Sequence, residues 1–332
     1  MSAPDSLLAA FSGKRVLVIG DLMLDEFLWG KVSRISPEAP VPVVNVASES
    51  YYPGGAANVA RNLREFTPHT MVMGRVGGDR YGCQLLELLA AGGIDTAGVQ
   101  QDAAAATTVK TRIIARNQQV VRVDRETKTP LGAGQEAEAI AFLEAALPDV
   151  DAVIVADYGK GYLTQTFADR ICELARRSGR ILAVDPHPYT SIVWRGATAI
   201  KPNRLEAFLA AGLAPADPVT PVLADEALLE AARRLLERWS PRHLLITLGE
   251  HGLLLLAGDG EQRHIPTCAK TVYDVSGAGD TAIALFTLSL AAGLGAAEAA
   301  DVANRASGIV VGKLGTAVVT AAELRDSLAA GR

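Results

Sequence analysis

The most informative part of the sequence is Asp274-Val275-Ser276-Gly277-Ala278-Gly279-Asp280. Its two glycines permit a turn in which successive backbone N–H groups converge, and the apolar run at residues 281–286 predicts a buried helix directly after it. Since the positive end of that helix would face the turn, the stretch predicts a site that stabilises a phosphate group.

The carboxylate of Asp280 stands at the entrance of this predicted helix. It is suited either to cap the helix or to act as the base that orients and deprotonates an attacking hydroxyl. Capping explains one aspartate but not the glycines before it, although an ordinary loop-to-helix junction stays open as an alternative. The stretch is typical of a kinase.

The composition is typical of a soluble α/β protein. The 332 residues are 49% hydrophobic with a formal net charge of -5, which fits one large domain spanning residues 1–332. The three cysteines, Cys83, Cys172 and Cys268, are too few and too widely spaced for a disulfide framework or a zinc site. We expect them to be packed in the interior of a cytoplasmic protein.

No segment of the sequence predicts targeting or a membrane span. Residues 1–12 lack the basic flank and apolar core of a signal peptide, and residues 281–300, which include Glu298, are expected to form a core helix. Mild acidity without a run of lysine or arginine argues against nucleic acid or an anionic membrane as partner. A small molecule is the expected ligand.

Strand-like runs alternate with helical patterns along the chain. The runs lie at residues 16–21, 71–76, 152–158, 181–185 and 243–248, and the helical patterns include residues 81–91, 167–178 and 225–239. This alternation predicts a mostly parallel central sheet with helices on both faces, whose ligands bind at the carboxyl ends of the strands. The polar residues at those ends are Asp21, Asp157, Tyr158, Asp185, Asn203 and Thr247.

Two segments interrupt the alternation, at about residues 32–53 and 107–125. The first is rich in proline and valine, and the second consists of two extended runs around a polar turn near residues 116–119. Both predict strands of a small, partly exposed sheet that folds over the site as a lid. Its edges and the apolar Val41, Val43 and Val46 favour pairing with a second copy, so we expect a homodimer.

The motif Gly54-Gly55-Ala56-Ala57-Asn58 ends the first of these segments and opens a helix. Its backbone N–H groups and the Asn58 amide are placed to bind a sugar hydroxyl, together with Asp21 from a neighbouring strand end. A plain glycine turn before a helix is the alternative.

Two further motifs each fit a structural and a functional interpretation. Lys201-Pro202-Asn203-Arg204-Leu205-Glu206 has the spacing of a capping box, and its Asn203 and Glu206 equally suit Mg²⁺ held through water beside nucleotide phosphates. Thr247-Leu248-Gly249-Glu250-His251-Gly252 follows a buried strand, and it is compatible with a nucleotide cradle or a simple hairpin.

Basic residues of the predicted lid are candidates for binding an anionic substrate. Lys110 and Arg112 lie two residues apart and so share one strand face, while Lys160 lies in a Gly-flanked loop. Together with Arg34 they are expected to converge on the substrate, with solvated surface charge as the alternative. No histidine is assigned a catalytic role, because none has metal-ligand spacing.

Two common nucleotide signatures are absent from the sequence. It contains no GxxxxGK[ST] phosphate loop, and no GxGxxG follows the first predicted strand. A Walker-type ATPase and a Rossmann dehydrogenase are therefore disfavoured.

With these motifs in this order, the chain resembles the ribokinase-like (PfkB) carbohydrate kinases over essentially its full length. Within that family it looks like the bacterial heptose-7-phosphate kinases of ADP-heptose synthesis. The segments that carry the narrower resemblance are Gly20-Asp21-Leu22-Met23-Leu24-Asp25, Ser33-Arg34-Ile35-Ser36-Pro37-Glu38-Ala39-Pro40-Val41-Pro42-Val43, Arg116-Asn117-Gln118-Gln119 and Val311-Gly312-Lys313-Leu314-Gly315-Thr316.

The resemblance implies a role for each matching residue. It implies that Asp280 is the catalytic base and that Gly277, Ala278 and Gly279 form the anion hole. It implies sugar contacts from Asp21, Asp25, Gly54, Gly55 and Asn58. For ATP it implies Asn203 and Glu206 near the phosphates and Mg²⁺, Thr247, Gly249 and Gly252 along the nucleotide, and Asn304, Ser307 and Gly308 near the adenine. A potassium site at Asp274 and Ser276 is also implied.

The implied activity is ATP-dependent phosphorylation of the anomeric hydroxyl of D-glycero-β-D-manno-heptose 7-phosphate. The alternatives are a kinase of another sugar phosphate, such as a fructose phosphate, and a sugar-phosphate-binding regulator without turnover. The chain departs from the family pattern at Val275, where threonine is common, so no hydroxyl is available there. It also lacks the HxGH signature of a fused nucleotidyltransferase, so adenylylation is expected to need a separate protein.

Overall fold

A computed structural model describes residues 3–116, 118–257, 260–269, 271–313 and 315–330. Two residues of the segments quoted above, Asn117 and Leu314, lie outside these ranges.

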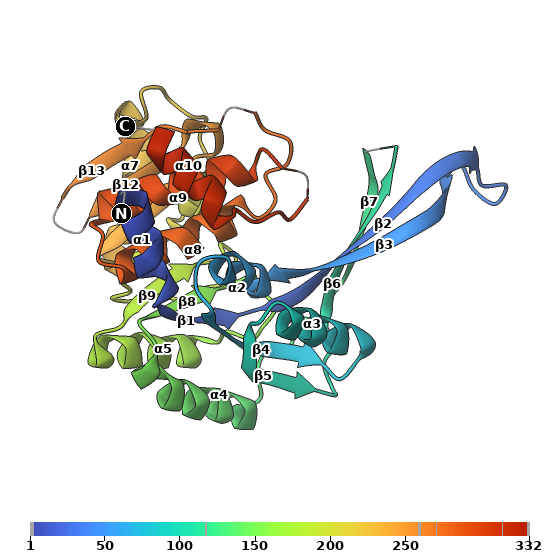
Figure 1. Cartoon of the computed structure of the whole chain (residues 1–332), viewed down its shortest axis with the longest axis horizontal. Coiled ribbons are helices and arrows are strands. Elements are labelled where there is room, and N and C mark those ends of the chain that lie inside the picture. The colour runs from blue at the N-terminus through green and yellow to red at the C-terminus, as the bar shows by residue number, and fades with distance from the viewer. Residues whose placement is uncertain (1–2, 117, 258–259, 270, 314, 331–332) are drawn as a thin grey trace.

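The central sheet of the described chain has nine strands in the order β13-β12-β11-β10-β9-β8-β1-β4-β5 (Figure 1). Neighbouring strands from β11 to β5 run parallel, and β12 and β13 are antiparallel. The mostly parallel sheet is therefore confirmed. Its strands are β1 (Arg15–Gly20), β4 (His69–Gly77), β5 (Asp95–Asp102), β8 (Ala152–Ala156), β9 (Ile181–Asp185), β10 (Ala199–Ile200), β11 (His243–Thr247), β12 (Leu253–Ala257) and β13 (Gln262–Ile265).

Helices cover both faces of this sheet, because central strands such as β8 are buried along their whole length and need cover on each side. One apolar core includes side chains of α1 (Ala3–Ser12), α2 (Ala56–Arg64), α3 (Arg80–Ala91), α8 (Ala278–Ala291), α9 (Ala296–Val310) and α10 (Ala321–Ala330). The other includes side chains of α4 (Ala133–Ala146), α5 (Gln165–Ser178), α6 (Arg204–Ala210) and α7 (Glu226–Trp239). The short 3-10 helices are η1 (Leu147–Asp149), η2 (Val222–Ala224) and η3 (Gly249–His251).

Two expectations about the core were wrong. The apolar stretch at residues 281–300 is not one helix, because α8 ends at Ala291 and α9 begins at Ala296, with Gly293 between them at φ +93°. The cysteines are not all interior: Cys83 and Cys268 are exposed and Cys172 is half-buried.

Among the described residues, no helix has the length and apolar character that crossing a membrane requires.

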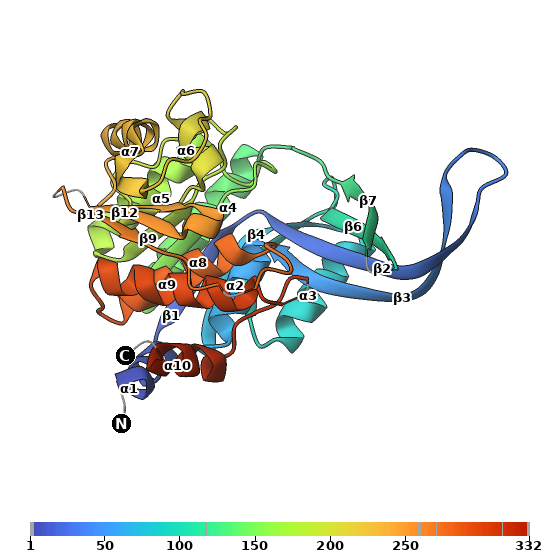
Figure 2. The same cartoon turned by 90° about the horizontal axis from the view of Figure 1, so that it is seen from above.

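A second, four-stranded sheet forms the predicted lid. Its order is β3-β2-β6-β7, from β2 (Leu22–Ile35), β3 (Pro42–Gly55), β6 (Thr108–Ala115) and β7 (Gln118–Arg125). The β2–β3 hairpin projects far beyond the rest of the chain in both views (Figures 1 and 2).

The first lid strand begins at Leu22, ten residues before the predicted start at 32. The buried run at Leu22–Phe27 pairs with both β3 and β6, and these partners lie too far away in sequence for a local pattern to reveal them.

Candidate active site

The turn before α8 lies close to side chains from two other elements, and anion binding there stays a prediction. Gly277 is the N-cap of α8 and adopts a left-handed conformation, with φ 81°. A methyl group added to Gly277 would lie 3.0 Å from Asn58 Nδ2, and one added to Gly279 would lie 3.3 Å from Lys201 Nζ. The glycines therefore let α2 and the end of β10 approach the helix end, whose first N–H groups have no partner within the helix.

Asp280 lies in the first turn of α8 but does not cap the helix. Its Oδ2 accepts a hydrogen bond from Asn58 Nδ2 at 2.6 Å, and its Oδ1 accepts one from the Tyr158 hydroxyl. Both carboxylate oxygens therefore accept hydrogen bonds from other elements, whereas a cap would accept from the backbone of its own helix. This arrangement suits a base that is held in a fixed orientation.

The surroundings of Asp280 shift the pKa of its carboxyl in opposite directions. Desolvation raises the pKa of its carboxyl above the ordinary value, and the hydrogen bonds from Tyr158 and Asn58 and the nearby charge of Lys201 lower it again in part. The net pKa stays above the ordinary value, which suits a group that must accept a proton.

Lys201 and Asp185 form a buried ion pair beside this turn. Lys201 follows β10, its side chain is 4% exposed, and its Nζ lies 3.0 Å from Asp185 Oδ1 at the end of β9. Burial raises the pKa of Asp185, and Lys201 counteracts part of that increase.

The predicted sugar-binding glycines are packed against the Asp25 carboxylate and the backbone of Asp21. A methyl group on Gly54 would lie 2.6 Å from Asp25 Oδ2, and one on Gly55, at φ +59°, would lie 2.6 Å from the Asp21 carbonyl oxygen. Arg112 Nη1 bonds Asp25 Oδ1 at 2.5 Å. In the described chain, the buried Oδ1 of Asn58 has no hydrogen-bond partner, which leaves an acceptor beside Asp280.

The Asp21 carboxylate organises a loop. It accepts hydrogen bonds from the backbone N–H groups of Tyr158 at 2.9 Å, Lys160 at 3.0 Å and Tyr162 at 3.2 Å. These bonds hold in place the segment from which the Tyr158 side chain reaches Asp280. A direct contact between Asp21 and a sugar stays a prediction.

The predicted basic residues do not all converge. Lys160 bonds Glu126, Lys110 Nζ lies 3.4 Å from Asp124 Oδ2, and Arg112 bonds Asp25 as described above. Arg34 is exposed near the far end of the β2–β3 hairpin. It lies nine residues beyond Asp25 on β2, about 30 Å at the rise of a strand, so its predicted convergence with the others within one chain was wrong.

The nucleotide-side motifs adopt their structural alternatives. Asn203 Oδ1 accepts from the Glu206 N–H at 2.9 Å, and Glu206 Oε2 accepts from the Asn203 N–H at 2.7 Å, so the capping box is confirmed. Thr247 lies beside Asn203 in a parallel bridge, and residues Thr247–Leu253 turn β11 into the antiparallel β12.

These findings leave room for the functional alternative. Glu206 keeps one carboxylate oxygen outside the capping box, and Asn203 is exposed, so water-mediated Mg²⁺ binding stays a prediction. Within the described ranges, no group of three or more His, Cys, Asp or Glu residues is arranged to hold a metal ion directly. Gly249 (φ +59°) and Gly252 (φ +86°) adopt backbone conformations that glycine favours.

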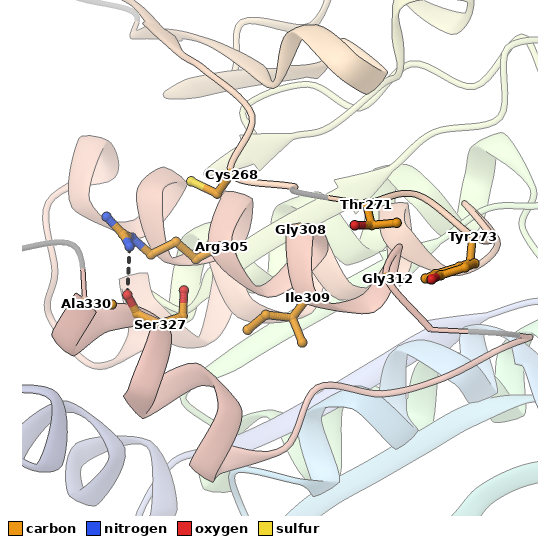
Figure 3. Close-up of a pocket in the computed structure, with 9 residues that line it drawn as sticks. All are labelled: Cys268, Thr271, Tyr273, Arg305, Gly308, Ile309, Gly312, Ser327 and Ala330. Atoms are coloured by element: carbon orange, nitrogen blue, oxygen red, sulfur yellow. Dashed lines mark hydrogen bonds between the residues drawn. The ribbon is translucent and has the colours of Figure 1, made fainter.

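A cavity of about 570 Å³ lies between α9, α10 and the loop before α8 (Figure 3). Of the three residues predicted to lie near the adenine, Gly308 lines this cavity, and adenine binding there stays a prediction. Asn304 Nδ2 donates to the Pro266 carbonyl at 2.7 Å, and the Ser307 hydroxyl donates to the Ala278 carbonyl at 3.1 Å, so these two residues tie the loop and α8 to α9. The α10 side is closed by Arg305 Nη1, which donates to the Ser327 carbonyl at 2.8 Å.

The predicted potassium residues hold a compact turn. Asp274 Oδ1 accepts from the Ser276 N–H at 2.9 Å, and Asp274 Oδ2 accepts from the Gly315 N–H at 3.2 Å. The carboxylate thus joins the loop before α8 to the loop after α9. Cation binding there stays a prediction.

Two residues of this site, Tyr158 and Lys201, were not predicted from the sequence to contact the turn before α8. Tyr158 was identified only as a polar residue at a strand end, and Lys201 only as the first residue of the Asn203 motif. Their approach to the turn before α8 depends on the spatial order of β8, β9 and β10, which the local sequence does not encode.

Comparison with known proteins gives one family and one fold. The model of the pfkB family carbohydrate kinases matches residues 14–322. The proteins named "Bifunctional protein HldE" of Geobacter metallireducens and Geobacter sulfurreducens are each 44% identical to this chain over 98% of its length. The chain spans 65% of the length of each of these curated relatives.

Solved structures of similar fold include two sugar kinases. Ribokinase from Giardia lamblia aligns with a TM-score of 0.74 at 21% identity, covering 97% of this chain and 100% of that one. Phosphofructokinase-2 from Escherichia coli in complex with potassium aligns with a TM-score of 0.73 at 16% identity, covering 96% and 99%. At these identities the likeness establishes the shared fold.

Proposed function

The chain belongs to the pfkB family of carbohydrate kinases, and from this premise we propose that it phosphorylates the anomeric hydroxyl of D-glycero-β-D-manno-heptose 7-phosphate with ATP. The product would be the 1,7-bisphosphate, an intermediate of ADP-heptose synthesis for the lipopolysaccharide core. The proposal rests on the resemblance of four sequence segments to heptose-7-phosphate kinases, and relatives that carry the name HldE support it. We expect the reaction to take place in the cytoplasm.

The observation that carries the proposed chemistry is the position of Asp280 at the N-terminal end of α8, with both oxygens held. The acceptor hydroxyl would replace one of the two internal donors and give its proton to Asp280. The N–H groups at Gly277 and Gly279 would stabilise charge on the phosphoryl group. Mg²⁺, held through water by Asn203 and Glu206, would neutralise charge on the phosphates of ATP.

The surroundings of the turn suit a polyol acceptor. The unpartnered Asn58 Oδ1 is an acceptor for a sugar hydroxyl, and the Asp25 carboxylate lies against Gly54. Arg112, Lys110 and Lys160 are the candidates for the 7-phosphate. Because each is paired with a carboxylate, the substrate phosphate would have to compete with that partner.

A panel of acceptors tests the proposed substrate. ADP release would be measured by a coupled assay with heptose 7-phosphate, fructose 6-phosphate, fructose 1-phosphate and ribose at equal concentrations. We expect the highest kcat/KM for heptose 7-phosphate. A higher kcat/KM for a fructose phosphate would mean that the enzyme is a kinase of a different sugar phosphate. No acceptor-dependent release of ADP would favour the sugar-phosphate-binding regulator.

We also propose that potassium activates the enzyme through the turn at Asp274 and Ser276. The support is the Asp274 carboxylate that joins this turn to Gly315, and a fold neighbour whose structure is described as a complex with potassium. Replacing potassium chloride by tetramethylammonium chloride at constant ionic strength should lower kcat. Equal kcat in the two salts would rule out this role.

A further inference from the structure

Lys201 lies beside the turn at Gly277–Gly279, and none of the roles above uses it. Its backbone N–H donates to the Val184 carbonyl at 2.8 Å, which fixes the residue to β9. From there the buried side chain passes Asp185 and ends next to Gly279, where an added methyl group would lie 3.3 Å from Nζ. The ammonium group thus sits between a carboxylate and the start of α8.

Pairing with Asp185 alone does not account for this position. An ammonium group has three N–H donors, and Asp185 Oδ1 lies within reach of one of them. Gly279 has no side chain to separate Nζ from the turn. A lysine placed only to neutralise Asp185 would have no need to reach the one helix end where the predicted phosphate site lies.

The charge of Lys201 also adds to that of the helix end. The N-terminus of a helix carries about half a positive charge on its free N–H groups. A full positive charge in a buried position next to it strengthens the attraction for an anion, since a site with little water screens charge weakly. Asp280 and Glu206 also interact electrostatically with Lys201, so the ammonium lies within the field of the predicted base and the predicted Mg²⁺ residue.

We propose that Lys201 is a catalytic residue whose ammonium group contacts the phosphoryl group during its transfer. In that step the sugar oxygen forms a bond to the γ-phosphorus, while the bond from this phosphorus to the β,γ-bridging oxygen breaks. ADP leaves with that electron pair, and the hydroxyl proton passes to Asp280. Lys201 keeps its protons throughout and stabilises negative charge on the phosphoryl oxygens.

The substitution Lys201→Met tests this role, because it removes the charge and keeps a side chain of similar length. The inference rests on kinase activity and not on the identity of the sugar, so the assay uses whichever acceptor the wild-type protein phosphorylates best. We expect kcat to fall by about 10²–10³-fold, as for loss of one donor to a developing anion, with KM for ATP within about threefold of wild type. A folded Lys201→Met protein with near-wild-type kcat would overturn the proposal, and so would a loss confined to KM for ATP.

Two further variants separate catalysis from folding. Lys201→Met leaves Asp185 buried without its partner, so the double variant Lys201→Met/Asp185→Asn removes both charges and should still lose kcat; wild-type kcat there would show that Lys201 only neutralises Asp185. The control is Arg170→Met on α5, outside the proposed site, which breaks another ion pair, 2.7 Å from Arg170 Nη1 to Glu173 Oε2. It should lower the thermal midpoint and retain kcat, and a loss of kcat equal to that of Lys201→Met would contradict the proposal.

Discussion

At the scale of the residue, the hydrogen bonds to Asp280 determine both its orientation and its protonation. Tyr158 and Asn58 each donate to one carboxylate oxygen, and hydrogen bonds to the ionised form of an acid lower its pKa. Desolvation acts in the opposite direction and is the largest single influence. The activity should therefore decline in acid at a pH above the ordinary range of a carboxyl group, since the protonated base cannot accept the substrate proton.

Tyr158→Phe should move this acidic limb of the pH profile of kcat/KM to higher pH. The substitution removes the hydroxyl and keeps the ring, and a hydrogen bond to a charged group contributes about 1.5–3 kcal/mol, which corresponds to roughly one to two pKa units. The measurement is kcat/KM from pH 5 to pH 9. An unmoved acidic limb would show that the Tyr158 hydroxyl does not act on the base.

Gly277→Ala should lower kcat far more than it lowers stability. The added methyl group would lie 3.0 Å from Asn58 Nδ2 and displace a donor to Asp280, and the left-handed φ of 81° adds strain of order 1 kcal/mol. The matched control is Gly179→Ala at the end of α5, where φ is 66° and no other atom lies within 4 Å of the added methyl. Both variants should lose similar thermal stability, and equal kcat values for the two would contradict the role of the turn.

The predicted and the missed residues of the site differ in how local their signals are. Gly277, Gly279, Gly54 and Asn58 stand in short motifs at element junctions, and such junctions can be recognised from sequence. Lys201 depends instead on α8 lying against the ends of β9 and β10, across a separation of more than seventy residues. Local sequence carries no information about such a contact.

At the scale of the element, the small sheet exposes apolar side chains that a second copy would cover. Val121 and Val123 lie two residues apart on β7 and are 46% and 49% exposed, and Val41 and Val46 on the β2–β3 hairpin are 50% and 48% exposed. Because successive side chains of a strand alternate, Val121 and Val123 share one face. Exposed apolar side chains that share one strand face favour association.

The double variant Val121→Lys/Val123→Lys should convert a dimer into a monomer. Two charges on one strand face oppose burial of that face in a dimer. Because β7 lies at the edge of the sheet, the substitutions should leave the fold of the single chain intact. Mass in solution at micromolar concentration is the measurement, and Leu223→Lys, at a 47% exposed apolar position on η2, is the control. A wild-type monomer, or dissociation by the control alone, would refute the proposed interface.

Element types were more predictable than element extents. The strand runs and helical patterns that were singled out lie in β1, β4, β8, β9, β11, α3, α5 and α7, because buried parallel strands and amphipathic helices leave periodic signals in sequence. The early start of β2 was missed, since its buried residues are paired in a second sheet that local periodicity cannot distinguish from the first.

At the scale of the whole molecule, Asp157 links global stability to pH. Burial raises the pKa of this carboxyl to about 6 in the folded chain, whereas an unfolded aspartate titrates near about 3.9. Between these values the folded state binds the proton more strongly, so the stabilisation is fully present below about pH 4 and is lost as the pH rises through about 6.

Comparison with Asp157→Asn isolates this effect, because other titrating groups are common to both proteins. The free energy of unfolding, measured by urea denaturation from pH 4 to pH 8, should fall for wild type relative to the variant as the pH rises. The variant loses carboxylate bonds to the Gly159 N–H and the Thr190 hydroxyl, which affects the offset between the curves and not their slope. A difference that does not change with pH would contradict the raised pKa.

On the proposed function, the whole fold brings one carboxylate and one helix end to the point of phosphoryl transfer. The most direct measurement is acceptor-dependent ADP release by Asp280→Asn beside wild type, with ATP binding measured on the same samples. We expect kcat to fall by about 10²–10⁴-fold, as for a lost general base, while ATP binding is retained. Unchanged turnover in Asp280→Asn would show that Asp280 is not the catalytic base.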